Sequence, residues 1–365
     1  MQTTIRTSSR FELKQLAELT AEQRQPFREL EADKDFFGLL VPRQSGAMNI
    51  KSVGHDTAAL LRRLATPSSL EPDDDVVDLI LDGVLEIESE GDFLSGADAL
   101  PVLCNLTETE EPHGVARLSL EALRHADDLK SDDAATLSAA MYFYNRIPIS
   151  RFWRARFPDR AAVLAHLEVD RDALSLWHRP SDNPGWISWS TRERPPRDAA
   201  SPTYKLYVSP RPENIRDAFH ALVRALADLG GADFKIGEDA AGLLRPDKLV
   251  AYFASRQQLD RAAAAVLARL DGCPSHGVPL TAGIDDAGLL SWGIDPPQNE
   301  RALSWLGPES WRLWLATKLG DAMAFAKTCG TRREIAAWQF ARERVRRLGV
   351  DIERWTPTDA LWRAA

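Results

Sequence analysis

The sequence predicts an α+β fold, in which a helical N-terminal region with a winged-helix-like hairpin is followed by a small sheet covered by helices. Three observations predict it. Helical patterns dominate the first half of the chain, and one short hairpin interrupts them. After a proline-rich linker, short apolar strands alternate with amphipathic helices. The chain has 365 residues, 44% of them hydrophobic, so it can bury the cores of two domains.

The N-terminal elements include the outline of a winged helix. A charged helix is expected over residues 11–33. Two further helices then precede a hairpin whose turns, Asp82-Gly83 and Ser89–Asp92, have typical turn chemistry. Helix, helix and hairpin together predict a winged-helix-like segment at 58–96. Its expected helices cover 58–65 and 75–81, and its expected strands cover 84–88 and 93–95.

The middle of the chain is helical and rich in tryptophan. Its clearest helices are expected over 118–129 and 134–144. Trp177, Trp186 and Trp189 are expected to pack in the core or between domains, because large aromatic side chains usually do so. The segment 191–203 is polar, contains three prolines and lacks apolar periodicity, so it is typical of a linker. We therefore expect domains at 1–198 and 199–365.

The C-terminal domain is expected to combine short strands with helices. The helix predicted over 214–229 ends at Gly230-Gly231, as a helix C-cap should. The remaining predicted helices cover 259–270, 309–325 and 333–347; the predicted strands cover 204–208, 234–237 and 249–253, with shorter extended pieces at 277–281 and 289–293.

Composition and missing motifs exclude several classes of function. The net charge of −9 argues against a non-specific nucleic-acid binder. Three scattered cysteines are typical of a reducing compartment, and no apolar run reaches membrane-spanning length, so we expect a cytoplasmic protein that contacts no membrane. The histidines lack metal-ligand spacing, and no glycine-rich phosphate loop is present, so neither a metal nor a cofactor is expected.

Cations at the starts and centres of the C-terminal strands form the candidate site. Lys205 and Tyr207 have the same parity, so both side chains lie on one face of their strand. If the strands are neighbours, these cations and phenols converge and suit a phosphate dianion or a carboxylate. The alternative is that each cation extends separately from a sheet edge into water. The residues concerned are Lys205, Tyr207, Lys235, Arg245, Lys248 and Tyr252.

The order of these motifs resembles the phosphothreonine lyase family of bacterial type III effectors. A Lys-x-aromatic strand, a helix, Phe234-Lys235-Ile236 and an arginine before a strand ending in tyrosine follow one another. The segment is also similar to Hop-type effectors and to lyase components of ribosomal-peptide (RiPP) biosynthesis. Gly277–Thr281 and Ser291–Gly293 resemble the Pro-x-Thr and Ser-Phe-Gly pieces of the Hop-type branch. The resemblance covers residues 203–297 and implies a phosphothreonine-lyase-like domain.

The resemblance also implies roles for individual residues. Lys235 corresponds to the base that removes the α-proton for β-elimination. Tyr207 stands where the family has its acid histidine, and a phenol of pKa ~10 is a poor acid beside an imidazolium near ~6.5. General acid catalysis is worth about 10²–10⁴-fold, so this difference would remove much of the rate. Phosphate or peptide binding is expected from Lys205, Arg245, Lys248 and Tyr252.

Two functional hypotheses follow. In the first, the chain is a catalytically impaired lyase-like protein that binds a ribosomally made precursor (leader) peptide, similar to the lyase-like peptide-binding proteins of crocagin-type pathways. A homologous partner subunit in a heterodimer is then expected, and the winged-helix-like segment could add a β-strand of the peptide. In the second, the chain is an active carbon–oxygen lyase on phosphoserine or phosphothreonine in a peptide. Its base would be Lys235, and its acid Tyr207 or an unassigned histidine. A third reading, use of the fold for another anion, rests on the cations alone.

Overall fold

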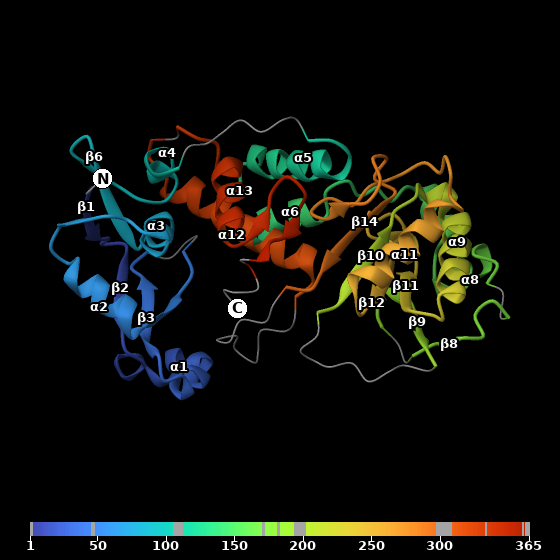
Figure 1. Cartoon of the computed structure of the whole chain (residues 1–365), viewed down its shortest axis with the longest axis horizontal. Helices are drawn as coiled ribbons and strands as arrows, with labels where there is room; N and C mark the ends of the chain where they lie inside the picture. Colours follow the sequence, from blue (N-terminus) through green and yellow to red (C-terminus); the bar gives the residue numbers. More distant parts are fainter. Residues whose placement is uncertain are drawn as a thin grey trace.

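An N-terminal part with two small sheets, a central group of helices and a larger sheet follow one another along the long axis of the molecule (Figure 1). The computed structural model describes residues 3–44, 48–104, 112–169, 172–180, 183–192, 202–296, 309–332, 334–359 and 361. The fold is α+β, as the sequence predicts.

The winged-helix-like segment contains its predicted helices and hairpin. Helices α2 (His55–Arg63) and α3 (Asp74–Leu81) precede the hairpin of β6 (Leu85–Ser89) and β7 (Asp92–Leu94). Two strands that the sequence did not indicate complete the sheet, in the order β5-β1-β6-β7. These are β1 (Thr3–Thr7) and β5 (Ser68–Leu70).

The single helix predicted over 11–33 is wrong. Its first residues form strand β2 (Phe11–Lys14), which alternates apolar and polar side chains and pairs with β3 (Phe36–Pro42). Only short helices follow, because Pro26 lacks the N–H that a continuous helix needs. These are η1 (Leu16–Glu18), α1 (Ala21–Arg24) and η2 (Gln25–Ala32), and strand β4 (Lys51–Gly54) completes the second sheet.

Four helices in the centre connect the two ends of the molecule (Figure 1). They are α5 (Gly114–Asp128), α6 (Ala134–Tyr142), α12 (Trp311–Cys329) and α13 (Ala337–Arg347), close to the predicted spans. α12 packs against both α6 and α13. Smaller helices are η3 (Gly96–Ala99), α4 (Leu100–Leu103), α7 (Arg151–Arg156), α8 (Arg160–His166), η4 (Pro212–Asn214) and α10 (Ala240–Leu243), and β15 (Val350–Asp351) pairs with β16 (Thr356–Pro357).

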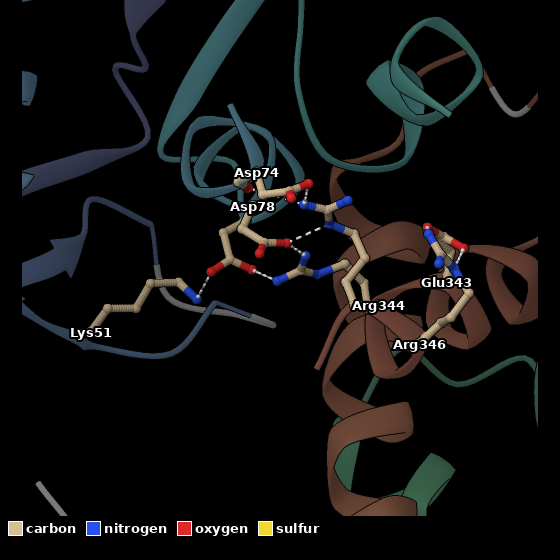
Figure 2. Close-up of polar contacts among 8 residues, drawn as sticks. Lys51, Asp74, Asp78, Glu343, Arg344 and Arg346 are labelled. Carbon is tan, nitrogen blue, oxygen red and sulfur yellow. Dashed lines mark hydrogen bonds and ion pairs between the residues drawn. The ribbon is translucent and has the colours of Figure 1, made fainter. Parts of the chain in front are cut away.

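Charged and apolar contacts join α3 to α13. Arg344 reaches Asp78 Oδ1 with Nη1 and Asp82 Oδ1 with Nη2, both at 2.7 Å, as Figure 2 shows. Arg347 Nε lies 2.7 Å from the same oxygen of Asp78. Beside these ion pairs, Phe325 packs in a cluster with residues of the N-terminal part. The acidic side of α3 is therefore in contact with α13 of the same chain.

The larger sheet is antiparallel throughout, in the order β13-β14-β10-β12-β11-β9-β8. Its predicted strands are present, whereas the extended piece expected at 277–281 is a loop before β13. β8 and β9 precede the predicted linker, so the boundary expected at 198/199 does not coincide with an edge of this sheet; residues 193–201 of the linker lie outside the described residues. The strands are β8 (Trp177–His178), β9 (Trp186–Thr191), β10 (Tyr204–Val208), β11 (Asp233–Gly237), β12 (Leu249–Phe253), β13 (Ala282–Gly283) and β14 (Leu290–Ile294).

One face of this sheet is apolar and covered by helices. Leu206, Phe234 and Ala251 alternate onto that face and are buried. α9 (Ile215–Asp228) and α11 (Arg256–Leu267) pack there, in front of the strands in Figure 1. Trp177 and Trp189 join the same core, as predicted, and both lie against the ring of Phe234. The opposite face is left for polar side chains.

Candidate functional site

The strand register gathers four of the sequence-predicted residues on the polar face of the sheet. β10 and β11 both pair with β12, so Lys205 lies opposite Tyr252, and Tyr207 and Lys235 lie on either side of Val250. The ammonium groups of Lys205 and Lys235 are 5.8 Å and 5.7 Å from the ring centroid of Tyr252. The strands are neighbours, so these cations and phenols lie close together, as expected from the sequence for neighbouring strands.

Lys235 is the cation of this cluster that has no carboxylate partner among the described residues. Its Nζ is 4.0 Å from the ring centroid of Trp186 on the next strand, a favourable cation–π distance. Burial, and then the charge of Lys205, lower the pKa of Lys235 from 10.5 to about 8. An incoming anion would restore the stability of the charged form.

Arg245 is already ion-paired within the chain. Its Nε and Nη2 donate to the two carboxylate oxygens of Asp247, each at 2.8 Å, and Nη2 also donates to the hydroxyl of Tyr142 at 3.0 Å. Burial opposes charge on both partners. The bonds to Asp247 nevertheless raise the pKa of Arg245, and the charge of Arg312, together with the bonds from Arg245, holds the pKa of Asp247 well below its usual range. The guanidinium carbon remains 5.2 Å from the ring centroid of Trp186.

Arg312 is a residue of this network that the sequence did not point to. It comes from α12, and only 1% of its side chain is exposed. Nη1 lies 2.7 Å from Asp247 Oδ2, and the other nitrogens donate to the backbone carbonyls of Tyr142 and Pro279. The one available signal was an arginine inside the apolar stretch Trp311–Leu315. Asp247 thus binds two arginines and links the sheet to the central helices.

Lys205 also has a partner inside the chain. Its ammonium forms an ion pair with Asp295, which follows β14 on the neighbouring side of β10. The lysine side chain is 12% exposed and the carboxylate 34%. Lys205 and Arg245, two of the residues expected to bind phosphate or peptide, are therefore bound to carboxylates.

Tyr207 is buried under the polar cluster. It is 3% exposed, packs with Val250 and Val278, and its hydroxyl makes no hydrogen bond to any described residue. Burial raises its pKa well above the ordinary value for a phenol. Tyr207 is therefore a poorer proton donor than an exposed tyrosine.

Lys248 lies apart from the cluster, fully buried at the start of β12. Its ammonium donates to the Pro210 carbonyl at 3.0 Å and lies 2.8 Å from His276 Nδ1. The other ring nitrogen of His276 bonds the Asn145 carbonyl. Burial lowers the pKa of Lys248 to about 7 and that of His276 to about 3. Both groups hold loops together and are enclosed by protein.

Trp186 is expected from the sequence to pack in the core, yet it contacts both Lys235 and Arg245 in the cluster.

Over the ranges that the structure describes, no three histidine, cysteine or acidic side chains gather in a way that could hold a metal ion. Within the same ranges, every helix is too short or too polar to cross a bilayer.

No protein-family model matches the chain, and no curated protein matches it. Effector proteins are among the solved structures that are similar to it. An effector protein from Pseudomonas syringae pv. tomato has a TM-score of 0.40 and 10% identity, over 67% of this chain and 98% of the effector. An effector protein from Pseudomonas syringae pv. syringae has a TM-score of 0.37 and 11% identity, over 66% of this chain and 99% of the effector.

Proposed function

We propose that this protein is a lyase-like peptide binder that holds an acidic group of its ligand at Lys235 and does not catalyse elimination. The observation that carries the proposal is that Lys235 has no carboxylate partner among the described residues, whereas Lys205 pairs with Asp295 and Arg245 pairs with Asp247. An ammonium that lies close to two aromatic rings and has no carboxylate partner suits one carboxylate, from an aspartate, a glutamate or a chain terminus.

The same pairings disfavour a phosphate dianion. Arg245 would have to leave a two-point ion pair with Asp247, and Lys205 would have to leave Asp295. Giving up either pair would remove its favourable contribution, and the buried Asp247 would lose one of its two arginines, so a dianion would gain less here than beside unpaired cations. The buried phenol of Tyr207 supplies no acid for the leaving group.

Sequence resemblance supports the more specific part of the proposal. The ligand would be a ribosomally made precursor peptide, bound in the cytoplasm with a homologous partner subunit. The second hypothesis, an active phosphoserine or phosphothreonine lyase, keeps one favourable observation. With a pKa of about 8, Lys235 would be partly neutral near pH 7, as a base must be.

A phosphothreonine peptide distinguishes the two functions. The full chain is incubated with the peptide, and released phosphate is measured together with the loss of phosphoric acid by mass spectrometry. We expect no turnover by the wild type or by Tyr207→His. Dehydrobutyrine formation that stops in Lys235→Ala would establish the lyase instead. In parallel, calorimetry compares matched peptides containing glutamate or glutamine; equal affinity for the two would refute binding through Lys235.

A further inference from the structure

A groove between α6 and α12 shares the residue Tyr142 with the network around the cluster. Its volume is about 910 Å³, within the range of ligand-binding pockets. Tyr142 lines one end of the groove, and the hydroxyl of this residue is also a hydrogen-bond partner of Arg245. α6 lies close to α12, since a Cβ on Gly320 would be 2.7 Å from the carbonyl oxygen of Ala134. The groove is therefore connected to the proposed site through a shared residue.

The end of the groove near the cluster is apolar. Phe143 and Leu313 both line it, and they are 43% and 41% exposed. Leu313, Thr317 and Asp321 follow at intervals of four residues, so they lie along one side of α12. An apolar ligand side chain placed here would cover both exposed residues.

The other end of the groove is acidic. Asp321 and Asp132 line it, together with Asn49 from the N-terminal part. Asp321 is half-buried, and none of the described lysines or arginines lies within ion-pair distance of it. Burial raises the pKa of its carboxyl, although the Asn49 side chain, Lys318 and Lys51 oppose this shift. A cation in the groove would compensate this carboxylate.

From this charge complementarity we infer that the groove binds an extended peptide segment with a basic side chain at the Asp321 end and a large apolar side chain at the Phe143 end. α6 has nine residues, which corresponds to about 13 Å and hence to about four extended residues of ligand. The inference rests on the proposed function, because it lets one peptide continue from the groove to Lys235. Along the ligand, a basic side chain would then be followed by an apolar one and then by an acidic one.

A positional-scanning library of acetylated decapeptides, presented to the full chain, tests this pattern. We expect selected peptides to contain lysine or arginine, then a large apolar residue, then an acidic residue. Asp321→Asn should remove the basic preference and weaken the best peptide about fivefold, as an ion pair of about 1 kcal/mol implies. Ala139→Trp, at an exposed position lining the groove, should weaken it about tenfold or more by filling the space. The exposed Asp271 and Ala264 provide the matched controls Asp271→Asn and Ala264→Trp.

The outcomes separate this inference from the proposed function. If the selected peptides show an acidic preference but no basic preference, the groove is not a binding site, and Lys235 remains one. The same conclusion follows if the basic preference is unchanged in both groove variants. If a basic preference persists in Lys235→Ala and no acidic preference is found, the groove remains a binding site and the proposed function is refuted. No selected peptide would refute both. A dimer that Ala139→Trp converts to monomer in sedimentation analysis would identify the groove as a self-interface instead.

Discussion

Lys235 places its ammonium 4.0 Å from the ring centroid of Trp186, on the adjacent strand of the sheet. The indole stabilises the positive charge but adds no negative charge, so the lysine is held in position and remains uncompensated. This differs from Arg245, which lies over the same ring but is bound to Asp247. Of the two cations beside Trp186, Lys235 is therefore available to pair with an anionic ligand, whereas Arg245 is already paired.

Peptide binding should weaken with rising pH because of Lys235. Its pKa of about 8 means that the charged form is the minor one by pH 9, and affinity for a glutamate peptide should fall about tenfold between pH 7 and pH 9. Folding stability should change in the opposite direction. The unfolded lysine, with a pKa of 10.5, binds more protons between pH 8 and pH 10.5, so this group's contribution to stability increases with pH over that window.

Calorimetric titrations and urea unfolding across pH 6.5–10 measure these two effects. Lys235→Met should abolish the pH step in affinity and flatten its part of the stability profile. An affinity step of the same size in Lys235→Met would assign the titration to another group.

Two tyrosine-to-phenylalanine changes should have different effects on stability. Tyr207→Phe removes a hydroxyl that makes no hydrogen bond to any described residue, so the free energy of unfolding should change by less than about 1 kcal/mol. Tyr142→Phe removes the acceptor of a 3.0 Å hydrogen bond from Arg245 and should lower it by about 1 kcal/mol. Urea unfolding at pH 7 measures both. A loss above about 1 kcal/mol in Tyr207→Phe would mean that the phenol has a structural role.

Asp247→Asn should be strongly destabilising. It leaves Arg245 and the buried Arg312 without their shared counter-ion, and removing one member of a buried ion pair costs about 3–5 kcal/mol. Asp260→Asn is the control, since its exposed pair with Arg256 is worth at most about 0.5 kcal/mol. Chemical unfolding compares the two variants, and equal losses would contradict a special role for Asp247.

Acid should weaken the same network. Because the folded pKa of Asp247 is lowered, its stabilising contribution is complete above the unfolded value of about 4 and is lost as the pH falls below it. The acid limb of the wild-type stability profile should therefore be steeper than that of Asp247→Asn.

The sequence predicted the cluster better than its charge state. The alternation of Tyr204–Val208 and Leu249–Phe253 indicated strands, and antiparallel pairing of neighbouring strands then brought the polar residues together. Nothing local revealed that Asp295 would return to Lys205, because the pairing of β14 with β10 sets that contact. Partners that depend on strand order are not encoded in residue spacing.

The missed elements have physical explanations as well. β9 alternates buried Ile187 and Trp189 with serines, a strand pattern that was overlooked because tryptophans are typical of any core. Its other aromatic residue, Trp186, lies at the polar face instead. In the N-terminal part, β1 and β5 are short and gain their stability by pairing with β6 or with each other, so propensity alone could not identify them.

Arg344 should hold the N-terminal part against the central helices. It bridges Asp78 and Asp82 of α3, whereas Arg346 on the same helix pairs only with Glu343 of α13 (Figure 2). Although burial opposes it, the charges of Lys51 and Arg344 lower the pKa of Asp82. Arg344→Met should therefore destabilise the N-terminal part by about 1 kcal/mol, while Arg346→Met, which leaves the interface intact, should have little effect.

Limited proteolysis followed by mass spectrometry measures this difference, because local opening exposes the N-terminal strands before the rest unfolds. In the wild type, raising the salt concentration to about 1 M should accelerate cleavage there, since the Debye length shrinks to about 3 Å. In Arg344→Met the rate should start higher and respond less to salt, because two of the screened ion pairs are already absent and the pairs of Arg347 remain. Equal salt sensitivity in both arginine variants would show that the apolar contacts around Phe325, rather than the ion pairs, hold α3 against α13.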